Sequence, residues 1–169
     1  MLQIIPTDTC YGLVGEYNEA DYDEIYQLKS RSFEKPLALV VRDFEDIKKY
    51  GRISDEQVNF LKKYLHPFSV LVPRVWDFPF DFDREKYRYL SIRVASVCFS
   101  KNLKNTLKFP LFLTSANPSG QAEAQDFLQA KKYFPEIDGF DGGICNQKPS
   151  DIFRFTESGE VEYLRKNYL

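Results

Sequence analysis

The chain is poor in the residues from which metal sites and disulfide frameworks are built. It has one histidine and three cysteines among 169 residues. Cys10, Cys98 and Cys145 are odd in number and far apart, which argues against a disulfide framework and against CxxC zinc spacing. We therefore expect three reduced thiols, buried or half-buried. His66 stands alone before a proline, so we expect it to be structural rather than part of a catalytic triad or a metal site.

Long apolar segments are also missing. No run approaches the roughly 18 apolar residues that a membrane-spanning helix needs, and the first residues lack the charged and then apolar pattern of a secretion signal. We therefore expect a cytoplasmic protein with no membrane partner. Apolar residues make up 43% of the sequence and charged residues 28%, which is ordinary for a globular protein with a core. This length predicts one folded domain over residues 1–169.

Charge is distributed unevenly, although the net charge is only −2. Residues 1–28 carry six acids and no base, whereas residues 29–108 carry 17 Lys and Arg against 10 Asp and Glu, giving +7. Two explanations of this basic middle stay open. It is either a set of solvated helix faces or a surface that binds nucleic acid.

Short apolar runs alternate with segments of helical spacing. The runs predict strands at residues 2–5, 37–41, 70–72, 90–94 and 111–113, and a terminal hairpin over 152–155 and 161–164. Apolar spacing and capping residues predict helices at 18–29, 43–50, 54–65 and 124–134 and around 103–107. The aromatic and acidic segment 76–88 is predicted to be a loop with a possible edge strand. This order favours an α/β fold with a mixed sheet and covering helices.

Four loops concentrate polar residues beside these elements, at 6–13, 29–37, 114–120 and 142–151. Lys29, Arg31 and Lys35 follow a predicted helix, where three cations either bind a polyphosphate or form a solvated helix end. Ser115 and Asn117 follow a buried strand, the place where open α/β sheets bind ligands, although a capping turn uses the same residue types. The sequence has no Walker A loop, GxGxxG or HExxH motif.

In their order along the chain, these loops resemble the motifs of one family. They read PTDTCYGL, KSRSFEKPL, TSANPSG and, after a glycine pair, SDI. They are similar to PTDTVYGL, KxRxxxKPL, TSANxSG and S-[TDE]-I of the YrdC/Sua5 family, the threonylcarbamoyl-AMP synthases. Two motifs depart from the family pattern. LHPFS at 65–69 stands in place of PGPxT, and only Arg93 remains of RxPxH, with Ala95 and Val97 at the proline and histidine positions.

The resemblance implies a YrdC-like twisted mixed sheet in a short single-domain protein. It also implies a nucleotidyltransferase that makes threonylcarbamoyl-AMP and pyrophosphate from L-threonine, bicarbonate and ATP. Two residues are implied as catalytic, by neutralising charge: Lys29 and Arg31. The residues implied for ATP are Lys29, Arg31, Lys35, Asn117 and Arg165. Those implied for threonine are Thr9, Arg93, Ser115 and Ser150.

The resemblance further implies Mg²⁺, carried in with ATP and held mainly by substrate phosphates and water, with no metal site made by the protein. The product would pass to threonylcarbamoyl transferase proteins for the modification of adenosine 37 in tRNA. Two alternatives stay open. One is a non-catalytic module that binds double-stranded RNA or tRNA through the basic middle of the chain. The other is carbamoyl transfer, as in the related domain of hydrogenase-maturation proteins.

Overall fold

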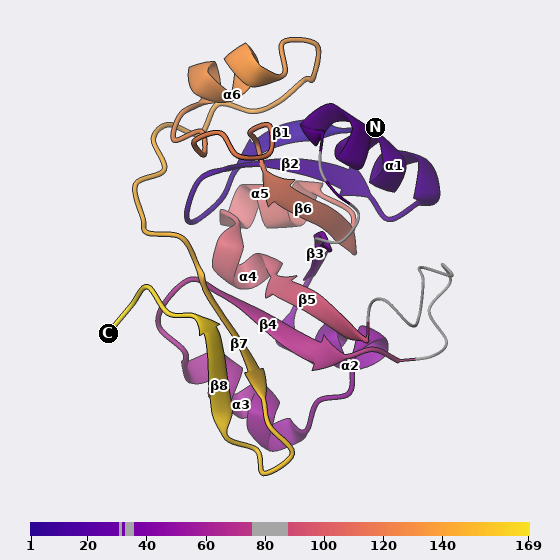
Figure 1. Ribbon diagram of the computed structural model, residues 1–169, viewed down its shortest axis with the longest axis vertical. Helices are drawn as coiled ribbons and strands as arrows, with labels where there is room; N and C mark the ends of the chain where they lie inside the picture. Colours follow the sequence, from indigo (N-terminus) through magenta and orange to yellow (C-terminus); the bar gives the residue numbers. More distant parts are fainter. Residues whose placement is uncertain (31, 33–35, 76–87) are drawn as a thin grey trace.

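The computed structural model describes residues 1–30, 32, 36–75 and 88–169. In these residues, eight strands form one twisted mixed sheet in the order β1-β2-β6-β3-β5-β4-β7-β8 (Figure 1). The strands are β1 (Gln3–Pro6), β2 (Tyr11–Glu16), β3 (Ala38–Val41), β4 (Phe68–Pro73), β5 (Tyr89–Val94), β6 (Leu111–Ser115), β7 (Asp151–Phe155) and β8 (Val161–Arg165). The pairs β3–β5 and β4–β7 are parallel and the other neighbours are antiparallel. The predicted α/β fold with a mixed sheet is confirmed.

Helices cover both faces of the sheet. They are α1 (Glu19–Lys29), a 3₁₀ turn η1 (Phe44–Asp46), α2 (Ile47–Tyr50), α3 (Asp55–Lys63), α4 (Ala95–Cys98), α5 (Lys101–Thr106) and α6 (Phe127–Tyr133). Asn18 caps α1 by accepting a hydrogen bond from the backbone N–H of Asp21, and Ser54 and Gln57 form the predicted capping box of α3.

Side chains alternate between two cores, as expected for a sheet buried on both sides. Leu39 and Val41 of β3 join a large cluster that packs against α1, α2, α3 and α6. Val40 between them points the other way, into a smaller cluster with Ala95 and Leu103 of the α4 and α5 segment. We call this second side the α4 face. In Figure 1, α4 and α5 lie in the middle of the molecule, while α6 and α3 lie toward opposite ends.

The structure corrects several boundaries predicted from the sequence. Strand β2 was predicted as part of a loop, because Gly12 and Gly15 lower the strand signal of YGLVGE. Helix α4 was not predicted, since it is only four residues long. The helix predicted over 54–65 is shorter, since α3 ends at Lys63 and Leu65 beyond it is 91% exposed. Helix α6 is shorter than the predicted 124–134, because Asp126 caps it.

Two further expectations are confirmed, the terminal hairpin and the buried thiols. The terminal hairpin forms, with Gly159 at a positive φ of 85° in its turn. All three cysteines are free and buried. The ring of His66 stacks on that of Tyr168, with ring centroids 4.6 Å apart. No helix in the described part of the chain is long and apolar enough to cross a membrane. The segment 76–88, predicted as a loop with a possible edge strand, lies outside the described residues except for Arg88.

Asp151 ties the terminal hairpin to the rest of the sheet. Its carboxylate is fully buried and accepts hydrogen bonds from the hydroxyl of Tyr64 (2.5 Å) and the backbone N–H groups of Asn167 (2.6 Å) and Tyr168 (3.3 Å). Burial alone would raise the pKa of this carboxyl, but the hydrogen bonds outweigh it and hold the pKa below its usual value. The charged form therefore contributes to stability.

Replacing Asp151 by Asn keeps the shape of the side chain but removes the charge. We expect the free energy of unfolding to fall by about 1–3 kcal/mol at neutral pH. The contribution of the carboxylate is present above the unfolded pKa of about 4 and is lost as the pH falls through the lower, folded pKa. Urea denaturation at neutral pH and near pH 3 measures this, and the difference between wild type and D151N should shrink in acid. Glu157→Gln, in the exposed hairpin turn, is the control. If D151N lowered the free energy of unfolding by the same amount at both pH values, the account would be contradicted.

Candidate functional site

A cavity of about 290 Å³ opens on the α4 face, beside the part covered by α4 and α5. Its floor comes from strands across most of the sheet, and the residues there share one face by register. The floor residues are Gly12, Ala38, Ser69, Ser91, Arg93, Leu113, Ser115 and Ile152, and most of them are small. Small side chains leave the face hollow where large ones would have filled it, so the sequence itself makes the cavity.

Gly12 shows how closely this floor is built. A Cβ at Gly12 would lie 2.4 Å from Cδ1 of Leu113 and 3.2 Å from Cγ2 of Thr7. Leu113 and Thr7 both line the cavity, so a larger residue at position 12 would push their side chains into it. The glycine of the PTDTCYGL segment is therefore required by close packing.

The loop before β2 forms one wall. Thr7 folds it into a turn, since its hydroxyl donates to the carbonyl of Cys10 (2.7 Å) and accepts from the backbone N–H of Thr9 (3.2 Å). Thr9 and Cys10 are buried and line the cavity. Burial, followed by the nearby charge of Glu123, raises the pKa of Cys10 to about 12. Cys10 is thus a neutral thiol, not a nucleophile, at physiological pH.

Arg93 lies on the floor and is paired within the protein. Its Nη2 donates to both carboxylate oxygens of Asp8, at 2.7 and 2.8 Å, and its Nε donates to the carbonyl of Phe68 at 3.2 Å. Arg93 and Asp8 side chains are only 8% and 10% exposed. Ile92 and Val94 are buried in the opposite core, which fixes the strand that carries Arg93, as predicted. Among the described residues, Nη1 of Arg93 has no hydrogen-bond partner, so this end of the fork is available to a ligand.

Ser150 and Arg165 form the opposite wall as a unit. Nη2 of Arg165 donates to the hydroxyl of Ser150 (3.1 Å), and its Nε donates to the carbonyl of the same residue (2.8 Å). Both residues line the cavity. The family resemblance implied that Ser150 binds threonine and that Arg165 binds ATP. In the structure these two side chains are hydrogen-bonded to each other.

Lys29 and Asn117 lie behind the cavity lining. Lys29 is 1% exposed, and its ammonium group donates to the backbone carbonyls of Ser115 and Asn117, the latter at 2.5 Å. The amide of Asn117 donates to the carbonyls of Pro118 (3.0 Å) and Gln121 (2.7 Å). Its Oδ1 is buried without a partner among the described residues. A buried acceptor without a donor marks a position for a ligand or water.

The cavity thus brings together five of the residues predicted for the site. They are Thr9, Arg93, Ser115, Ser150 and Arg165. Arg31 and Lys35 lie outside the described residues, so their predicted contacts with phosphate stay predictions. Sequence reasoning assigned no site role to Asp8, Glu123, Ala38, Ser69 or Ser91. Ala38 and Ser91 gave no signal beyond alternation along their strands, while Asp8 lies within the PTDTCYGL segment and Ser69 within LHPFS.

The described residues do not build a metal cage. They hold no group of three His, Cys, Asp or Glu side chains that could bind a metal ion. What they offer around the cavity is hydroxyls, the thiol of Cys10, the guanidinium groups of Arg93 and Arg165, and one carboxylate, Glu123. This donor set suits a small polar ligand. Any divalent cation would need most of its ligands from the substrate or water.

Comparisons with known proteins agree on one group. A family model described as "Telomere recombination", for the Sua5/YciO/YrdC group, matches residues 1–167. Threonylcarbamoyl-AMP synthase of Klebsiella pneumoniae is 30% identical over 165 residues, which are 92% of this chain and 85% of the relative. The human threonylcarbamoyl-AMP synthase is 31% identical over 142 residues, and this chain spans only 50% of its length.

Solved structures show the same fold. Escherichia coli YciO has a TM-score of 0.81 at 18% identity, covering 98% of this chain and 82% of its own. P. abyssi Sua5 in complex with L-threonine has a TM-score of 0.79 at 22% identity, covering 97% of this chain and 49% of its own. A HypF structure with phosphate and nucleotide has a TM-score of 0.80 at 20% identity, covering 97% of this chain and 26% of its own.

The pairing of Arg93 with Asp8 gives a testable consequence. In Asp8→Asn the buried guanidinium keeps a polar neighbour but loses its counter-charge, so we expect the free energy of unfolding to fall by about 3 kcal/mol. Asp55→Asn, which breaks an exposed ion pair with Lys48, is the control and should change stability little. Denaturant unfolding of both variants measures this. Equal effects would show that the Asp8–Arg93 pair is not structural.

Proposed function

This chain belongs to the Sua5/YciO/YrdC family, and we propose that it is a threonylcarbamoyl-AMP synthase, a nucleotidyltransferase. It joins L-threonine, bicarbonate and ATP into threonylcarbamoyl-AMP and releases pyrophosphate. The observation that carries the proposal is the cavity on the α4 face. There Arg93 presents a free guanidinium nitrogen over a floor of small residues.

The amino acid occupies this cavity in the proposal. Nη1 of Arg93 donates to the threonine carboxylate, while Asp8 holds Nη2 and fixes the plane of the guanidinium. Thr9, Ser115 and Ser150 supply short hydroxyls around the ligand. The volume of about 290 Å³ suits a small ligand better than a nucleotide with three phosphates.

The nucleotide lies toward the TSANPSG loop in the proposal. The partnerless Oδ1 of Asn117 is an acceptor for a donor on the nucleotide. Lys29 contributes by holding the carbonyls of this loop in place, which sets the position of Asn117. Arg31 and Lys35 are proposed to contact the phosphates, and Arg165 lies between the two ligands. Mg²⁺ is proposed to arrive with ATP, held mainly by phosphate oxygens and water, and to neutralise phosphate charge.

The chemistry explains why the site lacks a nucleophile. The threonine ammonium group first loses a proton, and the resulting amine combines with bicarbonate to give a carbamate and water. A carbamate oxygen then bonds to the α-phosphorus as the bond to the β-phosphate bridging oxygen breaks and pyrophosphate leaves. Such a transfer needs positioning and charge neutralisation rather than a protein nucleophile. The neutral thiol of Cys10 and the structural His66 are consistent with this.

The product is a mixed anhydride, which an acceptor nucleophile would consume. We propose that threonylcarbamoyl transferase proteins carry the group to adenosine 37 of tRNA. Binding of tRNA by this chain itself is a separate proposal, for which the +7 charge of residues 29–108 is the support.

The activity is tested by pyrophosphate release from ATP, with threonine, bicarbonate and Mg²⁺ omitted one at a time. We expect release that needs all of them. Val97 stands where the family has a histidine, so the rate should be about one or two powers of ten below that of a relative with the histidine, because about 1.4 kcal/mol corresponds to tenfold in rate.

The same assay can reject the proposal. If the folded protein binds ATP but releases no pyrophosphate under any of these conditions, while RNA binds with strong salt dependence, the synthase proposal fails. The RNA-binding module then replaces it.

Arg93 allows the two substrates to be separated. Arg93→Lys keeps a positive charge but loses the fork that serves Asp8 and the ligand together. We expect threonine to bind 10- to 100-fold more weakly, the equivalent of about 1.5–3 kcal/mol, with little change for ATP. Calorimetric titration of each ligand measures this. Arg154→Lys, in an exposed pair with Glu162 on a neighbouring strand, is the matched control. An equal loss for both ligands would contradict the assignment of Arg93.

A further inference from the structure

Glu123 is a charged group in the cavity that neither the fold nor the reaction described above uses. It lines the cavity and is half-buried. The other charged side chains in the described lining are Arg93, which is ion-paired with Asp8, and Arg165, which donates to the hydroxyl and carbonyl of Ser150. Glu123 has no ion pair or side-chain hydrogen bond among the described residues. A carboxylate withdrawn from water without a partner is costly unless a ligand supplies the opposite charge.

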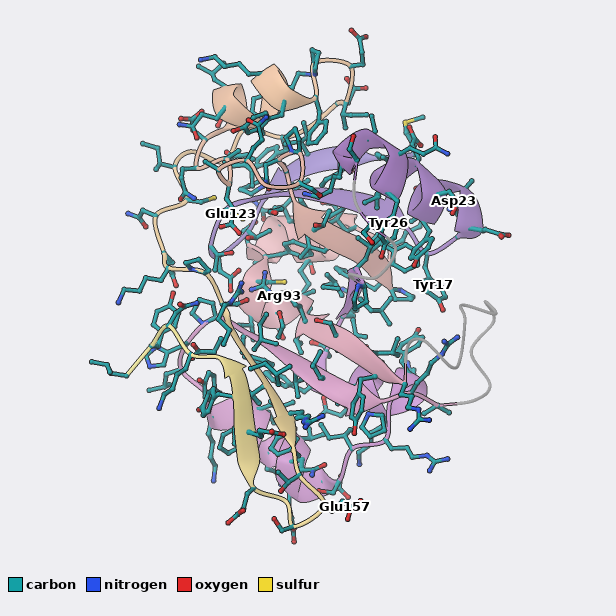
Figure 2. The ribbon with its side chains drawn as sticks, in the orientation of Figure 1. Tyr17, Asp23, Tyr26, Arg93, Glu123 and Glu157 are labelled. Carbon is teal, nitrogen blue, oxygen red and sulfur yellow. The ribbon has the colours of Figure 1, made fainter. Side chains whose placement is uncertain are left out.

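The backbone holds Glu123 firmly at this place. The next residue, Ala124, is 1% exposed, and its carbonyl accepts a hydrogen bond from the backbone N–H of Tyr11 (2.9 Å). The carbonyl of Gln125 accepts from the N–H of Cys145 (2.8 Å). The segment after the TSANPSG loop is therefore fastened to the start of β2. Figure 2 labels Glu123 and Arg93, with Glu123 above Arg93 near the middle of the molecule.

Among the described residues, the side chains that share a wall with Glu123 carry no positive charge. On the wall that it shares with Thr7, Thr9 and Cys10, the side chains are hydroxyls and a thiol. The negative charge of Glu123 acts on this wall, because burial and then the charge of Glu123 raise the pKa of Cys10. The described cavity thus has an anion, Glu123, at one part of its lining and the free Nη1 of Arg93 at another. Two opposite charges in a small cavity match a zwitterion.

We propose that Glu123 binds the ammonium group of the amino-acid substrate while Arg93 binds its carboxylate. This rests on the proposed function, and it makes Glu123 a residue that determines specificity. The pair of charges selects free α-amino acids and positions the nitrogen, whose ammonium form gives up a proton to water before the amine takes up bicarbonate. An α-hydroxy acid of the same shape keeps the contact with Arg93 but gains nothing from Glu123.

The experiment is calorimetric titration without ATP and Mg²⁺, using L-threonine and its α-hydroxy analogue, 2,3-dihydroxybutyrate. We expect Glu123→Gln to bind threonine about tenfold more weakly, because a charge-assisted contact becomes a neutral one. Binding of the hydroxy analogue should not change between the two proteins. Glu123→Asp, which keeps the charge, should lie between wild type and E123Q. Glu157→Gln, at an exposed turn far along the sheet, should behave as wild type.

Several results would overturn the proposal. The proposal fails if E123Q binds threonine as tightly as the wild type. It fails in the same way if the only effect of E123Q is that pyrophosphate release needs more Mg²⁺. An equal loss for threonine and the hydroxy analogue overturns it as well, since it points to a damaged cavity. Threonine binding that depends on Glu123 without any pyrophosphate release would leave this inference standing and remove the synthase. If pyrophosphate is released but threonine affinity does not depend on Glu123, the synthase stands and the role of Glu123 falls. If the wild-type protein does not bind threonine, both proposals fall.

Discussion

The buried ion pair between Arg93 and Asp8 is the interaction on which the site depends. Arg93 lies on β5 and Asp8 on the loop between β1 and β2, so the pair joins two segments that are 85 residues apart. The backbone N–H of Asp8 also donates to the carbonyl of Cys98 at the end of α4 (3.0 Å). A single short loop is thereby fixed to both the sheet and the helix beside the cavity. Removing either partner would leave a buried charge uncompensated.

This pair also decides what the cavity can do. Because Asp8 occupies Nη2 and the carbonyl of Phe68 occupies Nε, the guanidinium cannot turn, and among the described residues Nη1 is left without a partner. The ligand then meets a donor whose orientation is already fixed, which lowers the entropic cost of binding. The small floor residues and Gly12 have the matching role of keeping space open above that donor. Site and fold therefore use the same residues.

Local patterns in the sequence were sufficient for much of the fold. The cap at Asn18, the capping box at Ser54 and the hairpin closed by Gly159 all depend on neighbours within a few residues, and all three formed as predicted. Strand β2 was missed because its two glycines carry no strand signal, and its place comes from pairing with β1 and β6. Leu65 was misplaced because helix α3 stops two residues before it.

The sequence predicted part of the cavity lining but not the contacts within it. The motifs indicated Thr9, Arg93, Ser115 and Ser150, the resemblance also implied Arg165, and these residues do line one cavity. Nothing local indicated that Lys29 would donate to carbonyls 86 and 88 residues away, or that Asp8 would take one side of Arg93. These contacts follow from strand order and register, which are properties of the whole sheet. Glu123 lacks a motif altogether, so only the cavity reveals it.

A crystal structure of this protein with L-threonine tests the central claim most directly. The account predicts threonine in the cavity on the α4 face, with its carboxylate on Nη1 of Arg93 and the Asp8 pair still on Nη2. It would be contradicted by threonine bound elsewhere. It would equally be contradicted by threonine in this cavity with its carboxylate away from Arg93, or by a carboxylate that displaces Asp8.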